Sequence, residues 1–99
     1  MDENSKIRPL YDRAYELLLL KRVGKNIRDF REKHNVTQRE LAKLAGLQAS
    51  YVNDIEKGRR NLSFRSFLKI CIALDARPES LLIGTDRDSL SRSRIQENS

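Results

Sequence analysis

Residues 37–56 read TQRELAKLAGLQASYVNDIE, and this stretch decides the fold of the chain. Thr37 is a good helix cap, and Glu40 three residues later completes a capping box. Gly46 should end this helix, because glycine tolerates a left-handed backbone, and a second helix should follow over about 49–57. The inward side of the pair consists of aliphatic residues: Leu41, Leu44, Ala45, Val52 and Ile55. The stretch therefore predicts two short helices joined by a tight turn, which can place the second helix in the major groove of DNA.

Further helices are expected on both sides of this pair, from capping residues and from the helical spacing of apolar side chains. Their predicted ranges are 9–22, 23–33, 63–74 and 77–83. Gly24 weakens the helix locally, which separates the first two ranges. The four leucines at 17–20 point all around their helix, so we expect burial on more than one side. No segment alternates as a strand should, and the predicted fold class is all-α.

The composition divides the chain into three parts. Residues 1–22 form a leading extension that should be helical from about residue 9, and residues 23–84 hold the helix pair and its neighbours. Residues 85–99 are rich in Ser, Asp and Arg and lack an apolar period, so they are predicted to be a disordered tail. The 99 residues allow one domain with a modest core.

The charge of the chain favours a polyanionic partner. A formal net charge of +6 and a pI near 9.8 suit nucleic acid, the commonest such partner, although a basic surface can also serve solubility alone. The longest apolar run, at 17–20, is far shorter than the roughly 20 residues of a membrane span. The acidic and polar N-terminus does not suit a secretory signal. We therefore expect a cytoplasmic protein without a membrane partner.

The sequence shows no clear set of catalytic or metal-ligating residues. Cys71 is the single cysteine, which excludes an internal disulfide and a cysteine-cluster metal site. With His34 as the single histidine, no nucleophile–base pair, metal set or glycine-rich phosphate loop is evident. Cys71 lies among aliphatic residues and should be a buried hydrophobe, with a redox sensor as the alternative. No cofactor, metal or small-molecule substrate is expected.

Four segments carry a resemblance to a known family: FREKHNVTQ at 30–38, ELAKLAGL at 40–47, YVNDIEKGRRNLS at 51–63 and FLKICIALDARPESLL at 67–82. On these segments the chain resembles the Xre family of lambda-repressor-like helix-turn-helix proteins, which includes phage repressors and Cro proteins. The third segment is most similar to the controller proteins of restriction–modification systems. The resemblance implies a five-helix lambda-repressor-like DNA-binding domain, here preceded by a helical extension.

The exposed side of the second motif helix should read base edges, because its N-terminal end faces them in this motif. The candidate base-reading residues on this helix are Gln48, Ala49, Ser50, Tyr51, Asn53 and Asp54. The amides of Gln48 and Asn53 can each pair bidentately with adenine, whereas Ala49 can contact only a thymine methyl. Ser50 specifies weakly, and Asp54 can accept from cytosine N4 or orient an arginine. The family usually has Ser or Thr where this chain has Gln48.

The resemblance assigns further roles. It implies that Tyr51 touches DNA and that Arg60 reaches a base edge, most naturally a guanine. It also implies a phosphate contact from Gln38, which agrees with the anion preference of a helix N-terminus; an exposed polar residue is the alternative. Arg31 and Glu56 match a family pair that is commonly ion-paired within the fold, with two exposed charges as the alternative.

Polar and basic residues flank the motif on both sides and should contact phosphates. The candidate phosphate contacts are Gln38, Arg39, Lys43, Lys57, Arg59, Asn61, Ser63, Arg65 and Ser66. Most of them follow the second motif helix and lie near the cap of the next helix, a position that suits phosphate binding. The alternative for this run is a solvated loop.

The family usually forms dimers through its last helix. Leu81, Leu82 and Ile83 are too apolar to leave fully exposed and are the predicted dimer interface, although they can instead close the core of the monomer. A homodimer would read a palindrome on double-stranded DNA, and its occupancy of an operator would block RNA polymerase or recruit it. The leading extension can thicken this interface, bind another protein or pack on its own core.

The leading hypothesis is thus a sequence-specific transcriptional regulator, in one version the controller of a restriction–modification operon. The alternative is a protein-binding module, such as an antitoxin that represses its own operon. A small enzyme is disfavoured by the missing catalytic residues.

Overall fold

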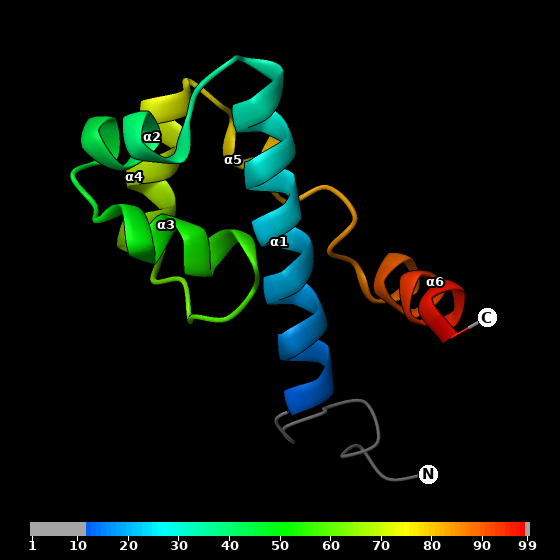
Figure 1. Ribbon diagram of the computed structural model, residues 1–99. Helices are drawn as coiled ribbons and strands as arrows, with labels where there is room; N and C mark the ends of the chain where they lie inside the picture. Colours follow the sequence, from blue (N-terminus) through cyan, green and yellow to red (C-terminus); the bar gives the residue numbers. More distant parts are fainter. Residues whose placement is uncertain (1–11, 99) are drawn as a thin grey trace, which may run out of the picture.

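The computed structural model describes residues 12–98, which form six α-helices and no strand (Figure 1). In chain order the helices are α1 (Arg13–Lys33), α2 (Gln38–Ala45), α3 (Ala49–Glu56), α4 (Phe64–Leu74), α5 (Pro78–Leu81) and α6 (Arg87–Asn98). Helix α3 packs against α1 and α2, and α4 packs against α2. The all-α prediction is confirmed, while the predicted helix start near residue 9 lies outside the described residues.

Helix α1 is continuous, so the prediction of two helices over 9–22 and 23–33 is wrong. Its N-terminal cap is Asp12, whose Oδ1 accepts a hydrogen bond from a backbone N–H of the first turn at 3.1 Å. Gly24 does not interrupt the helix, because it lies where α1 contacts α3. A Cβ atom at this position would overlap the backbone oxygen of Ile55. The glycine therefore permits close packing of two helices, a role that helix propensity alone does not reveal.

The two motif helices have the ends that the sequence predicts. Thr37 Oγ1 accepts a hydrogen bond from the Glu40 N–H at 3.0 Å, and Glu40 Oε1 accepts one from the Thr37 N–H at 2.9 Å. The hydrogen bond that the Thr37 N–H donates to the Glu40 carboxylate lowers the pKa of Glu40. Gly46 ends α2 in the left-handed conformation, with φ of 68°. Local signals thus fix where α2 begins and ends, and with them the turn into α3.

The core lies among α1 to α5, each of which contributes a fully buried side chain: Ile27, Leu41, Val52, Ile70 and Leu81. The prediction that Leu81 belongs to a dimer interface is therefore wrong. Its side chain is 0% exposed because it faces the other core residues of its own chain. The next two residues differ, since Leu82 is 41% and Ile83 68% exposed.

A buried ion pair joins α1 to α3. Arg31 Nε donates to Glu56 Oε2 at 2.7 Å, and Arg31 Nη2 donates to Glu56 Oε1 at 3.0 Å. The side chains are 9% and 2% exposed, and Arg31 Nη1 also donates to the carbonyl oxygen of Val36 at 2.7 Å. The hydrogen bond with Glu56 raises the pKa of Arg31, which stays charged. The pair fixes the end of α3 against α1 and against the loop that leads to α2.

Residues 87–98 form helix α6, so the prediction of a disordered tail is wrong for this range. Figure 1 places α6 on the other side of α1 from α2 and α3. Leu90 is 2% exposed, and the helix packs against α1. Arg87 pairs with Asp12 at 3.1 Å, and its guanidinium carbon lies 4.8 Å from the centre of the Tyr15 ring. Among the α6 side chains that the structure describes, residues 87–92, Leu90 is buried and Arg87 is stacked on Tyr15, and these contacts do not require an apolar period.

We predict that Gly24→Ala destabilises the chain by about 1–3 kcal/mol, because the added methyl group separates α1 from α3. The free energy of unfolding in urea measures this effect. Lys25→Ala, at the exposed neighbouring position, is the matched control and should change it by less than about 0.5 kcal/mol. A stabilising Gly24→Ala, as helix propensity alone would give, would contradict the close approach.

We predict that Arg31→Ala costs about 3–5 kcal/mol of unfolding free energy, because it leaves the buried Glu56 carboxylate without its cation. Arg28→Ala removes an arginine of the same helix whose ion pair with Glu32 is exposed, so about 1 kcal/mol or less is expected. Equal losses in the two variants would show that burial of the Arg31 pair has no energetic consequence.

Candidate nucleic-acid interface

Helix α3 turns its polar side outward because its apolar side is held in the core. Val52 is 0% and Ile55 2% exposed. The six predicted base-reading residues of this helix are all exposed or partly exposed: Gln48, Ala49, Ser50, Tyr51, Asn53 and Asp54. Gln48 occupies the N-cap position but makes no side-chain capping bond, so its amide remains at the surface. The structure therefore leaves all six accessible at the start and on the outward side of α3, although the Tyr51 ring also packs against the core.

Arg60 lies against α3 and is held there by two residues of that helix. Its guanidinium carbon is 5.1 Å from the centre of the Tyr51 ring, within the range of a cation–π contact. Its Nη1 is 3.9 Å from Asp54 Oδ2. The Tyr51 hydroxyl donates to Ser66 Oγ at 3.3 Å, which ties the ring to α4. Asp54 and Tyr51 thus orient the guanidinium that is predicted to reach a base edge.

Gln38, at the start of α2, is bonded to α3 on both sides of its amide. Its Nε2 donates to Glu56 Oε1 at 2.9 Å, and its Oε1 accepts from Asn53 Nδ2 at 3.2 Å. These three residues line a hollow of about 250 Å³ together with Arg28, Arg31, Glu32 and Lys57. Arg28 was not among the residues predicted for the site. The available signal was its place three residues before Arg31, on the same side of the helix.

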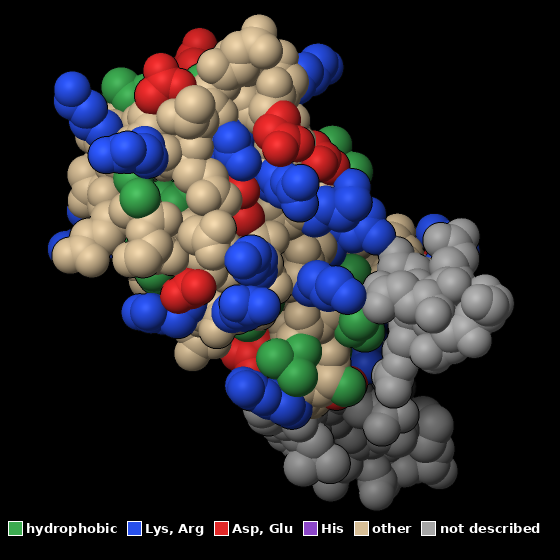
Figure 2. All heavy atoms as spheres, in the orientation of Figure 1, with side chains coloured by type: hydrophobic (Ala, Val, Ile, Leu, Met, Phe, Trp, Pro, Cys, Tyr) green, Lys and Arg blue, Asp and Glu red, His purple; other side chains and the backbone are tan. Residues whose placement is uncertain are grey.

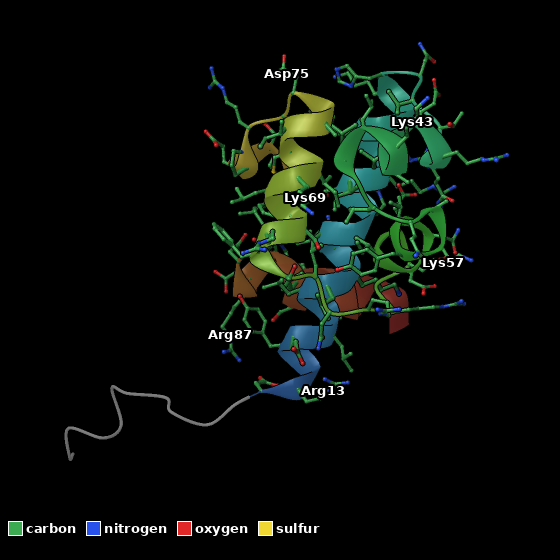
Figure 3. All side chains as sticks on the ribbon, turned by 90° about the vertical axis from the view of Figure 1, so that its left-hand side faces the viewer. Arg13, Lys43, Lys57, Lys69, Asp75 and Arg87 are labelled. Carbon is green, nitrogen blue, oxygen red and sulfur yellow. The ribbon has the colours of Figure 1, made fainter. Side chains whose placement is uncertain are left out.

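Basic side chains flank α3. Figure 2 shows Lys and Arg side chains gathered across the face where α1 and α3 lie. Lys43 of α2 and Lys57 at the end of α3 lie on the same side of the molecule (Figure 3). Of the predicted phosphate contacts, the exposed ones are Arg39, Lys43, Lys57, Arg59, Asn61, Ser63 and Arg65, and the partly exposed ones are Gln38 and Ser66.

The α3–α4 connection has a defined shape. Gly58 adopts a left-handed backbone with φ of 69°, and a Cβ there would overlap the backbone of Lys21 in α1. Ser63 Oγ accepts a hydrogen bond from the Ser66 N–H at 3.0 Å and so caps α4. The segment that carries Arg59 and Arg60 is therefore fixed at both ends, against α1 and at the start of α4.

The other candidate chemistries find no support in the described residues. Within 12–98, no group of three or more His, Cys, Asp and Glu side chains could hold a metal ion. Cys71 is 4% exposed, and burial raises the pKa of its thiol, which keeps it protonated and unreactive. No helix in the part that the structure describes is long and apolar enough to cross a membrane.

Comparisons with known proteins agree with this geometry. Residues 27–81 match the helix-turn-helix family HTH_3. An uncharacterized HTH-type transcriptional regulator of Archaeoglobus fulgidus is 42% identical over 62 residues, which cover 63% of this chain and 89% of that protein. Control protein C.BamHI of Bacillus amyloliquefaciens is 40% identical over 60 residues, covering 60% and 74%.

Two solved structures resemble the fold. The restriction–modification controller protein C.AhdI of Aeromonas hydrophila is 40% identical with a TM-score of 0.62, over 63% of this chain and 94% of that one. The clp gene regulator ClgR of Corynebacterium glutamicum is 31% identical with a TM-score of 0.72, over 81% and 84%. The lambda-repressor-like fold is thereby confirmed. The chain belongs to the HTH_3 helix-turn-helix family of Xre type, and it is a DNA-binding transcriptional regulator related to restriction–modification controller proteins and to ClgR.

Proposed function

We propose that this regulator binds a palindromic operator as a homodimer, with α3 of each protomer in the major groove. The observation that carries the proposal is the outward polar side of α3, which lies between two groups of basic side chains. A helix of this kind reads base edges while the flanking cations contact the two strands.

Different residues in and next to α3 contact different bases of the operator. Gln48 and Asn53 carry amides that match adenine, and Ala49 contacts a thymine methyl. Arg60 reaches a guanine from the loop after α3, with Tyr51 stacked beneath it. Because Asp54 pairs with Arg60 at 3.9 Å, it orients this arginine and offsets part of its charge in the absence of DNA.

The flanking residues supply affinity without sequence preference. Gln38, Arg39 and Lys43 contact phosphates from the α2 side, and the residues of the α3–α4 segment contact them from the other side. Each phosphate neutralised by a cation contributes about −0.9 to the slope of log K against log salt. Binding should therefore weaken steeply as salt is added.

A homodimer is supported by an exposed apolar face on α4 and on the residues that follow α5. Phe64, Leu68 and Ile72 are 74%, 37% and 79% exposed and follow one another at intervals of four residues along α4. Leu82 and Phe64 line a hollow of about 260 Å³ whose remaining lining is also apolar: Leu19, Leu20, Val23, Leu62 and Phe67. Ile83 lies next in the chain and is exposed as well. Such a face suits a symmetric contact between two copies, with Leu82 and Ile83 retained from the predicted interface and Leu81 excluded.

The relatives suggest the regulated genes. The C.BamHI and C.AhdI proteins are named as controllers, the latter of restriction–modification, and both are 40% identical to this chain over the matched region. We propose that this chain also controls a restriction–modification operon. Its occupancy of operator sites would block RNA polymerase at one position and recruit it at another.

Selection of bound fragments from a random oligonucleotide pool tests the binding mode. We expect two inverted half-sites whose centres are about 34 Å apart, one turn of DNA. A duplex of the same composition in scrambled order is the control. Equal binding to the selected and the scrambled duplex at moderate salt would contradict sequence-specific reading.

On the selected operator, we predict that Arg60→Ala costs about 1–3 kcal/mol and relaxes the preference at one base pair of each half-site. The neighbouring variant Arg59→Ala is the matched control, expected to weaken all sequences equally and to reduce the salt slope by about 0.9. Titrations against a set of single base-pair substitutions measure both effects. Uniform weakening by Arg60→Ala would place its guanidinium on a phosphate instead.

For the dimer, we predict that Leu82→Glu combined with Ile83→Glu yields monomers, because like charges then face each other across the two-fold axis. Sedimentation equilibrium measures the change in mass. Leu44→Glu introduces a glutamate on α2 and should leave the dimer intact. Leu44 is 64% exposed, so the prediction that it points inward is wrong and its replacement does not disturb the core. An unchanged mass in the double variant would exclude this face as the interface.

A further inference from the structure

A continuous chain of hydrogen bonds links the buried ion pair to the surface of α3. Glu56 accepts two hydrogen bonds from Arg31 and a third from Gln38 Nε2 at 2.9 Å. Gln38 in turn accepts from Asn53 Nδ2 at 3.2 Å. Glu56 is buried, whereas Gln38 and Asn53 are partly exposed, so the chain runs from the interior to the side of α3 that faces outward.

The chemistry of the groups fixes the direction of every bond in this chain. A carboxylate paired with arginine can only accept, so Gln38 must turn its amide nitrogen toward Glu56. The amide oxygen of Gln38 then faces Asn53, so Asn53 must donate a hydrogen bond to it from Nδ2. The Asn53 oxygen is consequently turned away from Gln38. An isolated asparagine on a helix surface would have no such preference between its two amide orientations.

We propose that Glu56, acting through Gln38, sets the orientation of the Asn53 amide and thereby makes Asn53 a selective reader of adenine. This inference rests on the proposed function, because it concerns how α3 reads the operator. In the fixed orientation Asn53 Oδ1 accepts from adenine N6, and the remaining N–H of Nδ2 donates to N7. Guanine presents two acceptors at the same places, and an amide whose oxygen is held outward cannot satisfy O6. Gln38 and Glu56 are positioning residues in this scheme.

The scheme separates two roles of Gln38. Its Nε2 has a second N–H beyond the one given to Glu56, and this group can still donate to a phosphate. Loss of the phosphate contact lowers affinity for every sequence by the same factor. Loss of the positioning role changes the ratio of affinities for adenine and guanine at one base pair only.

The test combines Gln38→Met, which keeps the length of the side chain without its amide, with Asn53→Ala and the double variant. Each is titrated against the selected operator and against its single base-pair substitutions, after circular dichroism has shown that it is folded. We expect Asn53→Ala to reduce the preference for adenine at one position by about fivefold or more. Gln38→Met should reduce the same preference at the same position, and in the Asn53→Ala background it should change no preference further.

Arg39→Ala is the matched control, since Arg39 is the exposed neighbour of Gln38 on α2 and should weaken all sequences equally. The positioning role is overturned if Gln38→Met lowers affinity uniformly, or if its effect on base preference adds to that of Asn53→Ala. The assignment of Asn53 as a reader is overturned if Asn53→Ala changes no preference. Failure of the proposed function would look different, because the unaltered protein would then show no sequence preference at all.

Discussion

The contact between Arg31 and Glu56 is the constraint on which the rest of the structure depends. It crosses from α1 to the last turn of α3, and the same guanidinium holds the carbonyl of Val36 just before α2 begins. Three segments of the motif therefore meet at one largely buried charged group. Because a buried charge cannot be left without its partner, the angle between α2 and α3 has little freedom to change. The outward side of α3, which we propose contacts DNA, is therefore held rigidly.

Local signals in the sequence were sufficient for the helix pair. The Thr37 and Glu40 box and the glycine after α2 act within a single turn, so residue type and spacing predict them without knowledge of the rest of the chain. Gly24 shows the limit of such reasoning. Its propensity predicts a weak point in a helix, but the residue that decides its role is Ile55, which is distant in the sequence and adjacent in space.

The wrong predictions for Leu81 and for residues 87–98 also arise from contacts between residues that are distant in the sequence. Burial of Leu81 depends on which side of α5 meets the core, and a four-residue helix is too short for its apolar pattern to indicate this. Helix α6 depends on Tyr15 and Asp12, which precede it by about 70 residues. A polar segment with one leucine gives no local sign that such partners exist.

For the interface, the sequence predicted which residue types surround α3 but not how they are bonded to one another. The hydrogen bond from Asn53 to Gln38 and the position of Arg60 over Tyr51 arise from packing between elements. Spacing along one helix cannot predict them, since each bond joins two different segments.

The continuity of α1 has a consequence for the length of the chain. This helix carries the Gly24 contact with α3 in its second half, and in its first half Tyr15 and Leu18 meet α6. Adding or removing one residue between Leu18 and Gly24 would rotate the first half by about 100° relative to the second. Leu90 and Arg87 would then lose their docking site, and a change between Lys21 and Gly24 would also shift Lys21 away from Gly58, next to Arg59 and Arg60. The number of residues in this stretch is consequently as constrained as their identity, although none of them faces a base.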